Sequence, residues 1–265
     1  MSLRFQQNTK QKKRVQIQIR TLALQNRMHK SFPFFKSVYQ SVIPCDIYQT
    51  WHTKLLPPKM QSRVDTLKSQ NPRFRHFLFD DSDCRIFIQT HFHSDVLYAY
   101  DHLIPGAYKA DLWRLCVLYI HGGIYLDIKL ICINGFKLIE LTERNHFVKD
   151  RFGLGMYNAL MISQSGNVFL WKCIQTIVKN VKNRFYGQGP LEPTGPTLMK
   201  TVAFQNKYNV NLDLVHFVDG GYILYKNYFV FSTEYPEYDA ERNESFQHLQ
   251  TKRYDKLWHE RTIYM

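Results

Sequence analysis

Apolar and polar positions alternate along the chain with two different periods, and their order predicts an α/β fold. Short apolar runs typical of strands occur at residues 41–51, 74–79 and 122–128. Apolar residues at helical spacing lie between them, at residues 57–72 and 107–119. Strands that alternate with helices favour a mostly parallel sheet flanked by helices, and this is the architecture we expect.

The pattern continues in the second half of the chain. We expect strands at 146–150, 157–163, 213–218 and 221–231, and helices at 167–185 and 197–208. The last thirty or so residues are polar with scattered aromatic side chains. Residues 14–28 fit either a strand or one face of a helix, and we predict a helix there.

Composition bounds the class of protein. The chain has 265 residues, 45% of them hydrophobic, which is enough for one large domain or a domain with appendages. No run of 18 apolar residues exists and the N-terminus lacks a signal-peptide core, so we expect neither a transmembrane helix nor secretion. Five cysteines without CxxC spacing argue against a disulfide framework or a zinc site and favour buried thiols in a reducing, cytoplasmic compartment.

The positive charge is concentrated in a tail. The formal net charge is +13, and residues 1–30 hold eight Lys and Arg without an acidic residue. We therefore divide the chain into a basic N-terminal extension, 1–40, and one domain, 41–265. A solvated extension is the simpler interpretation, and peripheral contact with anionic lipid is the alternative. Nucleic-acid binding would rest on this tail alone, and we expect none.

Polar residues follow three of the predicted strands. In a parallel sheet the carboxyl ends of the strands meet at one edge, where ligands bind. This places Gln49 to Trp51, Asp80 to Asp81 and Asp127 along a common edge. A pocket lined by polar and aromatic groups is expected there.

The stretch ADLWRLCVLYIHGGIYLDIKL, residues 110–130, carries the strongest chemical signal. Asp111 and Arg114 are three residues apart and share a helix face, which by itself indicates a surface ion pair of little value. The helix runs directly into Gly122 and Gly123, and that turn can bring the following strand and Asp127 back beside the helix. Two carboxylates and a guanidinium suit the binding of sugar hydroxyls and phosphate.

The same stretch resembles the DXD-type sugar-binding region of retaining glycosyltransferases. This family, glycosyltransferase family 32, includes fungal initiating α-1,6-mannosyltransferases and enzymes of capsular polysaccharide biosynthesis. Its pattern is A-D-x-x-R followed by G-G-x-Y-x-D-x-D, and all but the last aspartate are matched here, by Ala110, Asp111, Arg114, Gly122, Gly123, Tyr125 and Asp127. Further similar blocks occur in the same order, IPCDIYQTW, NPRFRHFLFDDSD, YNALMIS, EPTGPTLM and RYDKLW, so the resemblance covers roughly residues 43–260.

The resemblance implies a GT-A nucleotide-diphospho-sugar transferase fold and a retaining hexosyltransferase. The donor would be a UDP- or GDP-sugar, and the acceptor a glycan, lipid or protein. Trp51 would stack on the base, Asp111 and Arg114 would hold the sugar, and Asp127, Tyr125, Gln49 and Asp80 would complete the donor pocket. We expect Thr194 and Gly195 near the acceptor and Trp258 as the anchor of a lid. The alternative is a non-catalytic module that binds a nucleotide sugar or glycan on the same fold.

One departure from the family pattern concerns the metal. The second aspartate of the motif, which would bind Mn²⁺ together with Asp127, is replaced by Lys129, and a family histidine is replaced by Arg253. An ammonium group repels a metal ion. We therefore hypothesise that Lys129 and Arg253 stabilise the leaving diphosphate in its place, as catalytic groups beside Asp127. The simpler interpretation is that Lys129 points into solvent.

Two weaker signals have structural explanations. His91 and His93 have no partner at a spacing that fits a metal site, so a surface position is expected. The acidic run DDSD, residues 80–83, fits the first turn of a helix better than a nuclease-type cluster.

Overall fold

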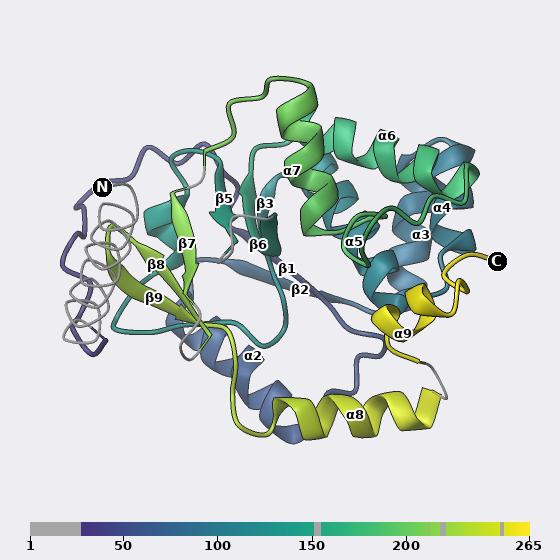
Figure 1. Cartoon of the computed structure of the whole chain (residues 1–265). Helices are drawn as coiled ribbons and strands as arrows, with labels where there is room; N and C mark the ends of the chain where they lie inside the picture. The colour runs from purple at the N-terminus through teal and green to yellow at the C-terminus, as the bar shows by residue number, and fades with distance from the viewer. Residues whose placement is uncertain (1–27, 151–154, 212, 218–220, 250–251) are drawn as a thin grey trace, which may run out of the picture.

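A single mixed sheet runs through the centre of the molecule, with helices on both faces (Figure 1). The computed structural model describes residues 28–150, 155–211, 213–217, 221–249 and 252–265. Nine strands follow one another across the sheet in the order β2-β1-β3-β6-β5-β7-β8-β9-β4 among these residues. They are β1 (Asp46–Thr50), β2 (Arg75–Phe79), β3 (Gly123–Leu126), β4 (Ile131–Cys132), β5 (His146–Lys149), β6 (Met156–Ser163), β7 (Leu214–Phe217), β8 (Tyr222–Tyr225) and β9 (Tyr228–Ser232).

The helices cover both faces of this sheet and one end of it. They are α2 (Pro58–Gln70), α3 (Asp81–His91), α4 (Ser94–His102), α5 (Gly106–His121), α6 (Val168–Lys182), α7 (Pro196–Gln205), α8 (Tyr238–Leu249) and α9 (Tyr254–His259), with a 3₁₀ turn η1 (Leu138–Leu141). The expected α/β class is confirmed. Helices α3 to α7 and α9 gather on one side, while α8 lies beside α2 on the other (Figure 1).

The sheet is parallel only in part. Strand β1 pairs in parallel with β2 and β3, and β5 pairs in parallel with β7. The long strand β6 enters antiparallel between β3 and β5, and the pairs that involve β8 and β9 are antiparallel. The parallel part nevertheless brings the carboxyl ends of β1, β2 and β3 to one edge, as the expected pocket requires.

The chain around residues 222–232 forms a hairpin. We expected a strand throughout 221–231, but Lys226 and Asn227 both have positive φ, 51° and 63°, and separate β8 from β9. Two such residues make the tight turn that matches the twist of a two-stranded ribbon. Apolar residues on both sides of the turn conceal it in the sequence.

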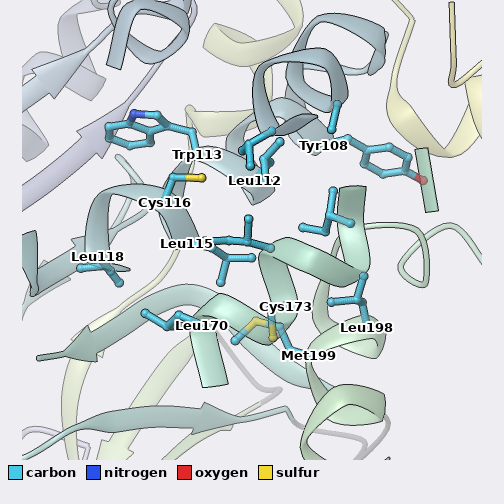
Figure 2. Packing of buried hydrophobic residues seen from close by; sticks show 14 of the residues in the cluster. Tyr108, Leu112, Trp113, Leu115, Cys116, Leu118, Leu170, Cys173, Leu198 and Met199 are labelled. Atoms are coloured by element: carbon cyan, nitrogen blue, oxygen red, sulfur yellow. The ribbon is translucent and has the colours of Figure 1, made fainter. Parts of the chain in front are cut away.

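The core beneath the parallel edge is built by α5, α6 and α7. Figure 2 shows the side chains of α5 interlocking with those of α6 and α7, among them Leu112, Leu115, Leu170, Cys173 and Met199. Helix α6 has the expected amphipathic spacing and starts at Asn167, which caps the backbone N–H of Phe169. Helix α5 is buried around nearly its whole circumference, so its polar residues are positioned by the core.

The start of α3 confirms the predicted acidic cap. The Asp80 side chain accepts a hydrogen bond from the backbone N–H of Asp83, and the Asp83 side chain accepts one from that of Asp80. This reciprocal pair satisfies two helix-end donors. The DDSD run is thus explained by local structure.

The described part of the N-terminal extension packs on the domain. Phe32 is buried, with its ring centroid 4.9 Å from that of Phe136 and 6.0 Å from that of Tyr225. The helix predicted for residues 14–28 lies outside the described residues except for Met28. All five cysteines have free thiols, and no helix in the described ranges combines the length and apolarity that a membrane span needs.

Candidate functional site

A glycine turn brings the two carboxylates and the guanidinium of the central motif together. Gly122 and Gly123 have φ of 68° and 104°, which side chains other than glycine rarely adopt. A Cβ at Gly123 would lie 2.8 Å from the carbonyl oxygen of Asp46, so the turn also has no room for a methyl group. The chain therefore passes directly from α5 into β3, and the residue after β3, Asp127, reaches the inner face of α5.

Arg114 lies between the two carboxylates. Its Nη2 is 3.5 Å from Asp111 Oδ1 and its Nη1 is 3.3 Å from Asp127 Oδ1. Asp111 and Arg114 are 9% and 6% exposed, whereas the side chain of Asp127 is 29% exposed. Asp127 is therefore the carboxylate of this group that a ligand reaches most easily.

Residues from two other elements fix the orientation of Asp111. Asn158 Nδ2 donates to Asp111 Oδ1 at 2.8 Å, and Thr194 Oγ1 donates to Oδ2 at 2.8 Å. A Cβ on Gly195 would lie 3.3 Å from Oδ2, so glycine leaves room for the carboxylate. The backbone carbonyl of Asn158 also accepts from Arg114 Nη1 at 3.0 Å. Thr194 and Gly195, which we expected near the acceptor, thus border Asp111.

Tyr125 completes the group from β3. Its hydroxyl donates to Asp127 Oδ1 at 2.8 Å, and the guanidinium carbon of Arg114 lies 4.5 Å from its ring centroid. Cations in such positions over an aromatic ring are attracted to it. Tyr125 therefore supports both Arg114 and Asp127.

Burial disfavours the charged form of the Asp111 carboxylate, and its neighbours favour it. Burial raises the pKa of Asp111, while Arg114, Thr194 and Asn158 act in the opposite direction. Burial also raises the pKa of Tyr125, so this phenol stays protonated and remains a hydrogen-bond donor. The group is preorganised before any ligand binds.

The other residues of the expected edge take different positions. Gln49 is fully buried, its Nε2 lies 3.5 Å from the carbonyl oxygen of Asp127, and its Oε1 lies 2.7 Å from His76 Nε2. Trp51 packs against Phe246 of α8, with ring centroids 6.2 Å apart, and its buried indole Nε1 has no hydrogen-bond partner among the described residues. Asp80 is occupied as the cap of α3.

The C-terminal helices cover this edge. Lys129 Nζ lies 4.9 Å from the ring centroid of Tyr238 on α8. Arg253 begins α9, is half exposed and pairs with Asp255, Nε to Oδ1 at 3.2 Å. Trp258 donates from Nε1 to the carbonyl of Tyr186 at 2.7 Å, which anchors α9 to the body of the protein.

Three contributors to the site escaped the sequence analysis. Asn158 is the polar residue within the apolar run YNALMIS, and that contrast was the available signal. Tyr238 and Arg242 lie on α8, where no apolar periodicity marks a helix. Helix α8 folds back beside α2 (Figure 1), which brings the Tyr238 ring to Lys129.

The side chains do not form a complete metal site. Both oxygens of Asp111 already accept hydrogen bonds, and the position two residues after Asp127 holds the ammonium of Lys129. No group of three or more His, Cys, Asp or Glu side chains within the described ranges is arranged to hold a metal ion. Asp127 would be a single carboxylate ligand, so a metal ion here would need the oxygens of a bound diphosphate and water as its further ligands.

Comparison with known proteins gives the family of this region. Residues 57–147 match the family described as "Glycosyltransferase sugar-binding region containing DXD motif". The chain is 28% identical over 158 residues to inositol phosphoceramide mannosyltransferase 3 of Schizosaccharomyces pombe, which covers 57% of this chain and 44% of that protein. It is 28% identical over 141 residues to the initiation-specific alpha-1,6-mannosyltransferase of Candida albicans, covering 49% and 35%.

Among solved structures, the PaToxG glycosyltransferase aligns with a TM-score of 0.49 at 16% sequence identity, covering 72% of this chain and 76% of that one. The chain spans less than half the length of the two curated mannosyltransferases named above.

Proposed function

We propose that this chain, whose residues 57–147 belong to the DXD-motif glycosyltransferase sugar-binding family, is a retaining hexosyltransferase that uses a UDP- or GDP-sugar. The observation that carries the proposal is the buried group of Asp111, Arg114 and Asp127, assembled from a core helix and a strand end. Mannosyltransferases among the relatives support a hexose as the transferred sugar.

Each member of the group has a proposed task. The carboxylate of Asp127 is accessible and accepts hydrogen bonds from vicinal sugar hydroxyls, while Arg114 supplies a positive charge behind it. Asp111 holds Arg114 in place and is itself held by Asn158 and Thr194. Such fixed groups favour the transition state because they need no reorganisation during the reaction.

The proposed reaction proceeds on one face of the sugar. The acceptor hydroxyl oxygen bonds to the anomeric carbon as the bond from that carbon to the diphosphate oxygen breaks, and the hydroxyl proton passes to the leaving diphosphate. Positioning and stabilisation of the leaving group supply the rate enhancement, without a covalent intermediate. Lys129 contributes positive charge beside Asp127, where the family pattern has a second carboxylate.

The donor nucleotide is proposed to lie along the β1 end of the edge. Trp51 would offer an aromatic face for a base and an indole N–H that has no partner among the described residues, and Gln49 and Asp80 shape the neighbouring edge. The acceptor, a glycan, lipid or protein, would approach past Thr194, Gly195 and the α9 segment that Trp258 anchors. We propose a cytoplasmic setting in which basic residues 1–30 contact anionic membrane.

A donor screen tests the proposal. The protein is incubated with individual UDP- and GDP-sugars, and nucleotide release is followed with Mn²⁺ and with EDTA, beside an Asp127→Asn control. Release from one donor that the control abolishes supports the enzyme, and release in EDTA supports a site in which Lys129 takes the metal's place. Donor binding without release in either condition would favour the non-catalytic binding module instead.

A further inference from the structure

The ring of Tyr238 on α8 is contacted by two cations. Lys129 Nζ is 4.9 Å from its ring centroid, and the guanidinium carbon of Arg242 is 5.4 Å from the same centroid. Both positively charged groups therefore gather around one ring, at the edge of the sheet that ends in Asp127. Two positive charges around one partly buried ring favour the binding of an anion beside them.

Arg242 has unused hydrogen-bonding capacity. Its Nη2 pairs with Asp239 Oδ1 at 2.9 Å, but Asp239 is 77% exposed, so that ion pair is worth little. Its Nε is buried and has no hydrogen-bond partner among the described residues. Lys129 Nζ likewise forms no ion pair with a carboxylate of the described residues. A buried guanidinium N–H without an acceptor among the described residues is available to a bound acceptor.

The pKa values of Tyr238 and Tyr254 respond both to Arg242 and to the carboxylates of the central group. Burial, and then the charge of Asp127, raise the pKa of Tyr238 to about 12. Burial and the charge of Asp111 raise the pKa of Tyr254, while Arg242 lowers it. Arg242 thus lowers the pKa of both tyrosines, which Asp127 and Asp111 raise.

Glu241, the residue before Arg242, attaches helix α8 to α2. Glu241 accepts hydrogen bonds from the backbone N–H groups of Lys59 and Met60, at 2.8 and 3.1 Å, and so caps the start of α2. Tyr235 donates to the same carboxylate at 2.8 Å. These contacts fix the helix against α2, beside which it lies in Figure 1.

We propose that Lys129 and Arg242, which both contact the ring of Tyr238, form a binding site for the diphosphate of a nucleotide sugar. The inference rests on the proposed function and deepens it, because it assigns the second cation to Arg242 and not to Arg253. Arg253 is half exposed and already paired with Asp255. Arg242 combines a partly buried side chain, an Nε–H without a partner among the described residues, and contact with the same ring as Lys129, which suit a polyanion.

Calorimetric binding of UDP, GDP and inorganic pyrophosphate to the full chain tests this site. Arg242→Gln is expected to weaken diphosphate binding about tenfold to a hundredfold, while binding of uridine or guanosine changes less than about twofold. Arg242→Lys recovers part of the loss because it keeps the charge. The matched control is Arg85→Gln, which removes an exposed arginine of α3 that pairs with Asp101 of α4. This variant is expected to bind as the wild type does.

The outcomes separate the two proposals. Equal loss of nucleoside and diphosphate binding in Arg242→Gln would assign Arg242 a structural role and overturn the inference, as would a larger loss in Arg253→Gln. Donor turnover with unchanged diphosphate affinity in Arg242→Gln would leave the enzyme standing without this site. Pyrophosphate binding that depends on Arg242 in a protein that turns over no donor would support the anion site and reject the transferase. Thermal melting of each variant checks that it is folded.

Discussion

The floor of the candidate site and its cover are built on different principles. The floor is the group of Asp111, Arg114 and Asp127 with its supports, and it comes from elements at the centre of the core. The cover is formed by α8 and α9. Helix α9 has no buried residue, and α8 has no apolar stripe.

The difference lies in where the polar groups find their partners. In the floor, each oxygen of Asp111 accepts a hydrogen bond from the protein. In the cover and beside it, the N–H groups of Arg242 Nε and Trp51 Nε1 have no partner among the described residues. The floor is therefore complete without ligand, while the cover leaves donors available to one. Under the proposed function, the floor would set the reaction geometry and the cover would contribute binding.

The largest expected effect is a difference in stability between substitutions in the floor and substitutions in the cover. Replacing Arg114 with Met leaves buried Asp111 without its cation and is expected to lower the free energy of unfolding by about 3–5 kcal/mol. Urea denaturation measures the change. Arg253→Met, which removes an exposed arginine of the cover, is expected to cost less than about 1 kcal/mol. Similar values for the two variants would refute the distinction between floor and cover.

The next effect concerns activity without loss of fold. Asp127→Asn keeps the shape of a partly exposed side chain and an acceptor for the Tyr125 hydroxyl, so stability should change by less than about 1 kcal/mol. Nucleotide release from the preferred donor is expected to fall about 100- to 1000-fold, because a fixed charge at the reacting sugar is lost. A rate within about threefold of the wild type would show that Asp127 does not contact the donor.

An intermediate effect is the pH dependence of the floor. Burial lowers the pKa of His76 to about 4, from an unfolded value near 6.5, and its Nε2 lies 2.7 Å from Gln49 Oε1. The unfolded chain then binds more protons between pH 6.5 and 4, so this contribution to stability is complete above pH 6.5 and is lost as pH falls to 4. We expect a loss on the order of 2 kcal/mol across this window for this histidine.

Denaturant unfolding at several pH values compares the wild type with His76→Asn, whose stability should depend less on pH between 6.5 and 4. Some dependence remains, because burial also lowers the pKa of His146 to about 4. Exposed His259 of α9 provides the matched substitution in the cover, and its replacement should leave the wild-type dependence intact. Unchanged dependence in His76→Asn would contradict the assignment.

The smallest expected effect is on the attachment of the cover. Glu241→Ala removes the acceptor for two N–H groups at the start of α2 and should lower stability by about 1 kcal/mol. The same change is expected to raise KM for the donor about fivefold and leave kcat nearly unchanged, since the floor is untouched. Steady-state kinetics on the preferred donor measure both, with exposed Glu244→Ala on the same helix as the control. A fall in kcat alone would place α8 in the chemical step.

Local signals in the sequence predicted much of the floor. The three-residue spacing of Asp111 and Arg114 placed both on one helix face, and the paired glycines indicated the return of Asp127 toward it. The acidic run before α3 predicted a cap that the structure contains. These features depend on residues close together in the chain, which spacing and turn chemistry report directly.

Features that depend on distant contacts were not predictable in the same way. Thr194 is 83 residues from Asp111 along the chain, and nothing in its own neighbourhood identifies the carboxylate that it binds. The antiparallel entry of β6 between β3 and β5 is a matter of sheet order, which strand patterns do not encode. Helix α8 has no apolar stripe, so the sequence pattern does not reveal it as a helix. It packs against α2 in the folded protein.

The glycine turn between α5 and β3 also constrains how such a site can change during evolution. With no linking residues beyond Gly122 and Gly123, and no space for a Cβ at either, an insertion or deletion there would shift Asp127 relative to Asp111. Helix α5, the glycine turn and β3 therefore form one unit that fixes the spacing of Asp111 and Asp127. Variation in chain length is left to segments that do not contact that unit.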